Sequence, residues 1–501
     1  MATTQLDNLT EALQRHLGLQ QAQTFAAENV TADGIARLTG RRGDVTHLFE
    51  LWSDKAVDLV DGWDPHEHPS VLRALRHVLG AGLVVQRYAN GLPKAFQPLS
   101  PEFITNKNTN TVFRDLGRSV VEGLWRDPEV RTALKDRIGT WTGRHPLVHV
   151  LAPLCDPAKY EDKTGEAGHL ADAARRDPQL DKWLDGVVRQ DWRTWLRATE
   201  ILSPDEQIET MTALIGLHLH LALLWRLRDQ SAPDTAPCYF VAVAGHGMDQ
   251  SCTRAAYNCY AYWGDRTANA LREVARVTIE RVASEDGELA TALRADNWTR
   301  PGSWATVSIK GTQSKRATEA FHNALRDGIA KAQQSGNGPR PNEILELLVD
   351  SLVRAFSTDS GVASKAKDYL RITGRAVGLV GPDEAYARKR YQMDERALSL
   401  LARLHAARGQ DEIASDEEER NSLEAFLDDI FHRYGIVITR ERDRIRQRLD
   451  AEDGAKAMRP LLKLFPDDEP MRRNRAQFDR RLDELRFVRR YSDASAVVHI
   501  A

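Results

Sequence analysis

Cysteine is scarce in this sequence, and the few cysteines lack the spacing of a scaffold or of a metal site. Only 4 cysteines occur in 501 residues, and none belongs to a CxxC pair. Secreted disulfide-rich proteins and structural zinc ribbons depend on such patterns, so the sequence argues against both classes. A reducing, cytoplasmic location is the expectation that follows.

Targeting signals and long apolar runs are lacking as well. Residues 1–6 contain neither the basic patch nor the apolar core of a signal peptide. The most apolar stretch, residues 213–227, contains two histidines and is shorter than the roughly 20 residues that a bilayer requires. We therefore expect neither export nor a membrane span.

The familiar catalytic and cofactor-binding motifs are also missing. The chain has no GxSxG and no HExxH motif, and residues 308–316 lack the GxxxxGK[ST] spacing of a phosphate loop. His66 and His68 lie in a turn with two prolines, without enough donors at ligand spacing to hold a metal. The sequence therefore predicts no cofactor, no metal and no catalytic residue, which favours a non-enzymatic protein.

Charge of one sign does not dominate the chain. The 69 Lys and Arg residues nearly balance the 72 Asp and Glu residues, while 42% of the residues are hydrophobic. Such a chain can bury a core, but it is not a protein that coats nucleic acid indiscriminately, so any nucleic-acid surface must be local. At this length, several domains are expected.

Helical patterns account for most of the sequence. Trp192 and Trp195 belong to one helical pattern, and Ser203-Pro204 supplies the cap and first residue of the next helix. That helix is apolar around nearly its whole circumference, which is typical of the centre of a bundle. Its residues His218 and His220 point about 200° apart, so we expect core histidines rather than ligands of one ion.

Strand patterns are short and mark the limits of the predicted domains. Residues 238–243 read as a strand that leads into a helix from about Ser251, and residues 434–439 read as a strand after a helix over 419–433. Residues 333–341 collect most breaker residue types. The predicted division is a helical domain (1–232), a mixed α/β domain (233–334), a linker (335–341) and a C-terminal region (342–501).

The last thirty residues predict a helix followed directly by a β-hairpin. Phe478, Leu482 and Leu485 share one side of a helix, and two β-prone segments, 487–491 and 496–500, flank a turn. Winged helices end in this way. The predicted fold class is therefore mainly α, with α+β in parts: a multi-helical body with a C-terminal winged-helix-like domain.

Arginines crowd this C-terminal helix and hairpin, and arginine suits phosphate contact because its planar fork binds two oxygens. Double-stranded DNA is accordingly a predicted partner, although a winged helix can also dock a protein. A second basic region contributes two further candidates. The predicted nucleic-acid-binding residues are Arg472, Arg473, Arg475, Arg481, Arg486, Arg489, Arg490, Lys389 and Arg390.

The helical body, the segment 431–438 and the final helix with its hairpin together resemble the large accessory proteins of multi-gene bacterial anti-phage defence operons. This resemblance implies a subunit that works beside an ATPase, a methyltransferase or a nuclease. The sequence thus predicts a non-enzymatic DNA-binding or scaffolding subunit of a bacterial defence complex. Two alternatives stay open: a divergent metal-dependent nuclease or hydrolase with acids near 382–389, and a pure protein-interaction module.

Overall fold

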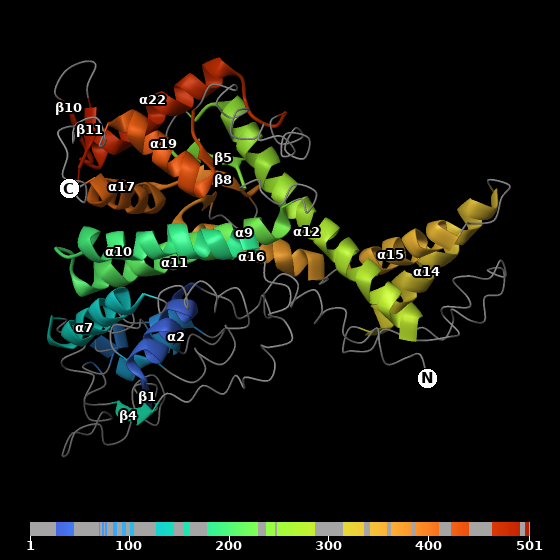
Figure 1. Cartoon of the computed structure of the whole chain (residues 1–501), viewed down its shortest axis with the longest axis horizontal. Helices are drawn as coiled ribbons and strands as arrows, with labels where there is room; N and C mark the ends of the chain where they lie inside the picture. Colours follow the sequence, from blue (N-terminus) through green and yellow to red (C-terminus); the bar gives the residue numbers. More distant parts are fainter. Residues whose placement is uncertain are drawn as a thin grey trace. The chain divides into compact units, whose positions relative to one another are not determined.

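The structure is a computed structural model in which helices dominate and strands are short (Figure 1). The predicted mainly α class, with α+β in parts, is therefore confirmed. The described residues are 27–44, 70, 73–74, 76–77, 84–87, 93–96, 101–104, 127–144, 155–159, 178–228, 237–245, 248–285, 314–334, 341–357, 362–382, 387–409, 422–439, 463–490 and 496–499.

The chain forms two compact units, and neither is continuous in sequence. One unit combines Met1–Ala22 with Ala261–Leu370, and the other combines Gln23–Tyr260 with Arg371–Ala501. This differs from the predicted division into consecutive domains. Residues 335–340 of the predicted linker lie outside the described residues.

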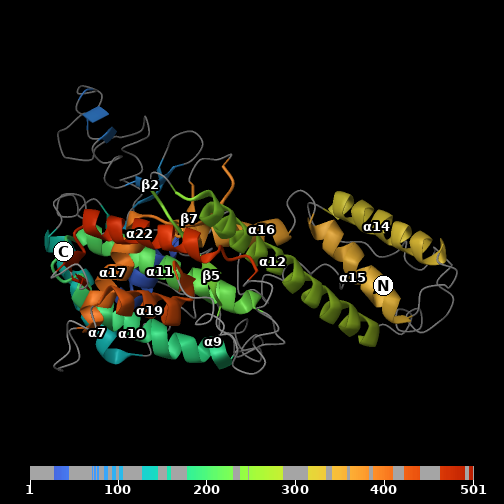
Figure 2. The same cartoon turned by 90° about the horizontal axis from the view of Figure 1, so that it is seen from above.

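The first unit contains a helical hairpin in which α14 and α15 lie side by side (Figures 1 and 2). Gly328 permits this close packing, because a Cβ atom there would lie 2.6 Å from Leu347 Cδ2. Arg272 of α12 pairs with Asp350 of α15. The helices of this unit are α14 (Ser314–Gln334), α15 (Pro341–Ser357) and parts of α12 (Gln250–Glu285) and α16 (Val362–Val377).

In the amino-terminal part of the second unit, α2 contacts α7, α11, β1 and η4. The side chains of Thr31 in α2 and Thr212 in α11 share a hydrogen bond of 3.0 Å. Strands β1 and β4 pair antiparallel, as do β2 and β3. The elements are α2 (Ala27–Thr39), β1 (Arg41–Asp44), β2 (Val84–Arg87), β3 (Pro93–Phe96), η4 (Pro101–Phe103), α7 (Pro128–Arg144) and β4 (Asp156–Lys159).

The most apolar helix, α11 (Pro204–Leu227), begins where its cap residues predict. The side chain of Ser203 accepts a hydrogen bond from the amide of Glu206, and the Glu206 carboxylate accepts one from the amide of Ser203. By length and composition α11 could cross a membrane, but 83% of its most apolar window is buried inside the protein. It follows the helical segments α9 (Pro178–Trp183), η8 (Leu184–Val188, a π-helical turn) and α10 (Arg189–Ala198).

Two small sheets gather strands from distant parts of the chain. The segment 239–243 pairs in parallel with β9 on one side and with β8 on the other, and β7 pairs antiparallel with β8. The predicted strand 238–243 is thus confirmed as β5 and β6, which pair with β9 and with β8 in two small sheets. The strands of these sheets are β5 (Tyr239–Phe240), β6 (Ala242–Val243), β7 (Val380–Gly381), β8 (Arg390–Met393) and β9 (Ile436–Val437).

The carboxyl-terminal helices complete the second unit. The helix predicted over 419–433 is α19 (Leu423–Tyr434), which starts later because Ser422 caps it by accepting a hydrogen bond from the amide of Ala425. The predicted helix with a following hairpin is present, whereas the winged-helix assignment stays a prediction. The remaining elements are α17 (Glu395–Gly409), α22 (Asp468–Glu484), β10 (Val488–Arg490) and β11 (Ala496–Val498).

Candidate nucleic-acid interface

Helix α22 buries one face and exposes the other. Met471, Asn474, Phe478 and Leu482 are buried, and their spacing of three or four residues places them on one side of the helix. The ring of Phe478 stacks on that of Phe426 in α19, with centroids 5.6 Å apart. This packing leaves the opposite side of α22 free to carry arginines.

Asn474 joins α22 to the two small sheets through its side chain. Its Nδ2 donates hydrogen bonds to the carbonyls of Val241 (3.0 Å) and Ile438 (2.9 Å), and its Oδ1 accepts one from the amide of Val243 (2.9 Å). A buried amide with three such bonds fixes both the position and the rotation of the helix. Sequence reasoning missed this residue, although its spacing from Met471 and Phe478 places it on the apolar side.

Five described arginines of the helix, the turn and the hairpin are exposed, and all of them except Arg473 lack a carboxylate partner among the described residues. Of these four unpaired arginines, Arg472 and Arg480 belong to α22, Arg486 lies in the turn after it and Arg489 lies in β10. They are therefore available to an anion from outside the protein.

Arg486 has an unusual backbone conformation. Its φ of 60° lies in the left-handed region, which side-chain-bearing residues rarely adopt. Its amide donates a hydrogen bond to the carbonyl of Asp483 at the end of α22. The turn directs the chain from the helix into the hairpin. The backbone of Arg486 is strained in this turn, and a glycine would adopt the same conformation without strain.

Three of the predicted phosphate-binding arginines form ion pairs within the protein, whereas the unpaired Arg480 was not among the predicted residues. The guanidinium groups of Arg473, Arg475 and Arg481 each lie beside a carboxylate on another element. These carboxylates belong to Asp249 (3.1 Å), Glu424 (2.9 Å) and Glu395 (2.9 Å), respectively. The predicted basic surface thus contains two sets of arginines, one exposed and unpaired and one paired.

The hairpin packs against the body of the unit through β11. Ser422, at the start of α19, forms a bridge with Val497, and Val498 is buried. Phe487 is also buried, with the guanidinium of Arg403 5.3 Å from its ring centroid. Arg489 in β10 is exposed, while the side chain of Arg490 lies outside the described residues.

The second basic region lies at the start of β8. Lys389 precedes β8 and donates a hydrogen bond to the carbonyl of Pro382 (2.6 Å), and Arg390 is the first residue of β8. The paired arginine Arg481 reaches Glu395, which follows the other end of that strand. Lys389 and Arg390 thus lie at the end of β8 that is opposite to Glu395, the partner of Arg481.

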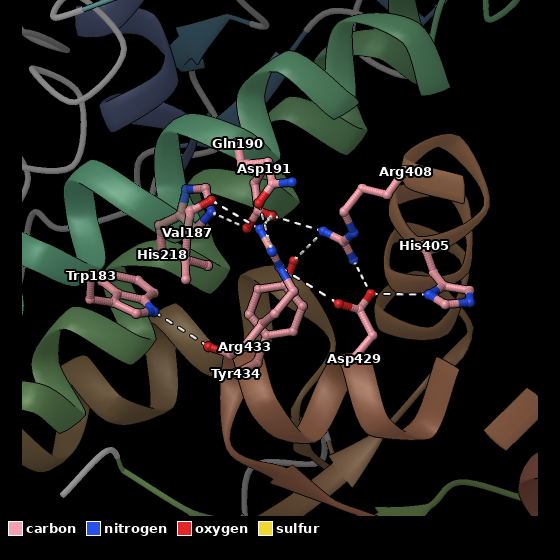
Figure 3. Close-up of polar contacts among 10 residues, drawn as sticks. All are labelled: Trp183, Val187, Gln190, Asp191, His218, His405, Arg408, Asp429, Arg433 and Tyr434. Carbon is pink, nitrogen blue, oxygen red and sulfur yellow. Dashed lines mark hydrogen bonds and ion pairs between the residues drawn. The ribbon is translucent and has the colours of Figure 1, made fainter. Parts of the chain in front are cut away.

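A buried cluster of opposite charges, which the sequence did not predict, joins the helices α10, α11, α17 and α19 (Figure 3). The fully buried carboxylate of Asp191 in α10 accepts hydrogen bonds through Oδ1 from Arg408 of α17 (2.9 Å) and Arg433 of α19 (2.7 Å). Its Oδ2 lies 3.0 Å from Nε2 of His218 in α11. Four helices thus meet at one carboxylate.

Asp429 of α19 is the second carboxylate of this ionic cluster. It pairs with Arg408, and its Oδ2 lies 3.1 Å from Nδ1 of His405. Its Oδ1 lies 3.8 Å from the guanidinium of Arg433. Two carboxylates thus face two guanidinium groups in this cluster.

The electrostatics of the ionic cluster favour ionised carboxylates. Burial by itself would raise the pKa of Asp191, but the hydrogen bond from His218 and the charges of Arg433 and Arg408 outweigh it and lower the pKa to about 2. The pKa of Asp429 is also lowered, because its hydrogen bond with His405 and the guanidinium of Arg408 outweigh burial. Both carboxylates are therefore held in the ionised form by cations on neighbouring helices.

The histidines of α11 behave as the helical spacing predicts. His218 and His220 are both fully buried, and they contact different partners: Asp191 in one case and the hydroxyl of Thr373 in the other (3.1 Å). The expectation of two core histidines is confirmed.

Among the described residues, no group of three or more His, Cys, Asp or Glu side chains could hold a metal ion. The four cysteines are free and buried. His66 and His68, together with residues 383–386 of the nuclease alternative, lie outside the described residues.

Comparison of the chain with protein-family models, with curated proteins and with solved structures found no match.

Proposed function

We propose that this protein is a non-enzymatic DNA-binding or scaffolding subunit in which α22 and the hairpin β10–β11 contact the phosphate backbone of duplex DNA. The observation that carries the proposal is the set of four exposed arginines, Arg472, Arg480, Arg486 and Arg489, without carboxylate partners among the described residues. A guanidinium group binds phosphate oxygens in two places, and such contacts position a protein on DNA without reading its sequence.

The distribution of charge along α22 indicates which end meets DNA. Asp468 and Glu469 occupy the first turn of the helix, whereas Arg480, Arg486 and Arg489 gather at its end and in the hairpin. Phosphate contact is therefore proposed mainly at the carboxyl-terminal end. Because the whole chain has a net charge of −3, binding should depend on these few contacts and fall steeply with salt.

The strained backbone of Arg486 supports the same proposal. A left-handed conformation costs a residue with a side chain roughly 1–2 kcal/mol. Such strain is commonly found where function requires the side chain.

The test is a titration of a fluorescein-labelled DNA duplex of arbitrary sequence with the full-length protein. Fluorescence anisotropy measures the binding affinity at several salt concentrations. Changing all four exposed arginines to alanine should weaken binding to every sequence alike. It should also flatten the slope of log affinity against log salt by about 0.9 for each lost phosphate contact.

The matched control removes the same charge from other helices. Arg131 and Lys135 of α7 and Arg326 and Lys331 of α14 are exposed, and their change to alanine should leave the salt slope intact. An unchanged affinity and slope in the first variant, or no binding by the intact protein at low salt, would refute the proposal. The helix and hairpin would then be a protein-docking element.

A further inference from the structure

The paired arginines of α22 share one arrangement. Each lies between two carboxylates, one three or four residues away on α22 itself and one on another helix or its cap. The carboxylates on α22 are those of Glu469, Asp479 and Glu484, which pair with Arg473, Arg475 and Arg481, respectively.

The three carboxylates outside α22 all stand at helix amino termini. Asp249 precedes α12 and accepts hydrogen bonds from the amides of Ser251 (2.8 Å) and Cys252 (3.2 Å). Glu424 lies in the first turn of α19, and Glu395 is the first residue of α17. The dipole of a helix favours a negative charge at this end, which suits these acids to their position facing the arginines of α22.

These ion pairs lie near solvent and can exchange partners. One side chain of each pair is more than half exposed (Arg473 57%, Glu424 72%, Glu395 61%), whereas its partner is only partly exposed (Asp249 16%, Arg475 20%, Arg481 25%). Exposed ion pairs contribute little net stability, because water and salt solvate both charges well. A closely spaced row of DNA phosphates is therefore able to replace these carboxylates as the counter-charge of the arginines.

We propose that Arg473, Arg475 and Arg481 are a masked second set of phosphate-binding residues, and that Asp249, Glu424 and Glu395 limit DNA binding by holding them. This inference rests on the proposed function of α22, and it adds a means of regulation. Phosphates first reach the unpaired arginines, and they engage the masked set only when they displace the carboxylates. Removing the negative charge of those acids therefore increases the affinity for DNA.

The experiment replaces the three acids with uncharged residues of similar shape, as Asp249→Asn, Glu424→Gln and Glu395→Gln together in the full-length chain. Asparagine keeps the cap of α12. With the same labelled duplex, binding should become tighter, and the slope of log affinity against log salt should steepen by about 0.9 for each released arginine.

A matched variant separates local release from a general change of charge. Glu129→Gln, Asp136→Asn and Glu319→Gln remove three exposed acids from α7 and α14, and they change the net charge equally. An equal gain in both variants would overturn the inference. Adding alanine at Arg473, Arg475 and Arg481 to the first variant should abolish its gain, and persistence of the gain would also overturn it.

The outcomes distinguish this inference from the proposed function. If the wild type binds duplex but the acid-neutralised variant binds no tighter, the masking inference is wrong and the proposed function stands. If only the acid-neutralised variant binds duplex, masking is supported and the unpaired arginines are insufficient for binding. Failure of both proteins to bind at low salt overturns both proposals.

Discussion

Changing Asp191 to asparagine removes the charge that faces two buried guanidinium groups. The side chains of Arg408 and Arg433 are only 11% and 14% exposed, so solvent cannot replace the lost carboxylate. Breaking a buried ion pair in this way costs about 3–5 kcal/mol of unfolding free energy. The fall of the Asp191 pKa from 3.8 to about 2 corresponds to roughly 2 kcal/mol. The mutational cost should be larger, because asparagine leaves two buried guanidinium groups facing a single carboxylate, that of Asp429.

The assay is urea unfolding followed by tryptophan fluorescence, since Trp183 and Trp192 lie about 6 Å from His218. The control is Asp185→Asn on the preceding helical turn, where the pair with Arg189 is 3.6 Å long and both side chains are more than a third exposed. That change should cost less than about 1 kcal/mol. Equal losses in the two variants, or a loss below about 1 kcal/mol for Asp191→Asn, would refute the reasoning.

The same residue predicts a pH dependence. The pKa of Asp191 is about 2 in the folded protein, which is below its ordinary value of 3.8, so its contribution to stability is complete above about pH 4 and is lost as the pH falls toward 2. Wild-type protein should lose stability steeply over this interval. The Asp191→Asn variant should lack this acid-induced loss of stability. Urea unfolding curves of both proteins at a series of pH values measure it, and an equally steep loss in the variant would contradict the argument.

Three further outcomes are expected. Gly435→Ala should lower the free energy of unfolding, measured in urea, by more than about 2 kcal/mol. The backbone φ of Gly435 is 67°, and a Cβ atom there would lie 1.9 Å from the carbonyl oxygen of Pro237. A near-neutral effect would contradict this close approach. Arg486→Gly should stabilise the fold by about 0.5–1 kcal/mol, because glycine adopts the left-handed backbone conformation without strain. The same change should weaken duplex binding in the anisotropy assay. A variant that is more stable and also binds duplex more tightly would argue against a functional role for this arginine. The fragment 342–501, which is the predicted C-terminal region, should not fold alone, because its strands β8 and β9 pair with residues 239–243. Dispersed amide resonances from the isolated fragment would contradict this expectation.

Local features of the fold could be predicted from the sequence because they depend on near neighbours in the chain. The start of α11 follows from Ser203 and Pro204, and the helix–hairpin order of the last thirty residues follows from apolar spacing. The strand predicted over 434–439 is shorter, with β9 limited to Ile436–Val437. Such boundaries shift because pairing partners decide where a strand ends.

The partners themselves could not be predicted, because periodicity within a segment says nothing about a segment some 200 residues away. Asp191 illustrates the limit. It lies on the same side of α10 as Trp195 and Ala198, which suggests burial, but the sequence does not reveal that its counter-charges are Arg408 and Arg433. The arginines of α22 were identified from composition, whereas their division into paired and unpaired sets required the carboxylates of other helices.

The central strand segment 239–243 also constrains how the chain is made. Its partner β8 lies about 150 residues later in the sequence, since Ala242 pairs with Gln392, and β9 follows later still. At a synthesis rate of about 5–20 residues per second, this buried segment waits roughly 10–30 seconds for its first neighbour to emerge. During that time both of its edges can pair with other chains, so slow translation or premature termination before β8 should favour aggregation of the nascent protein.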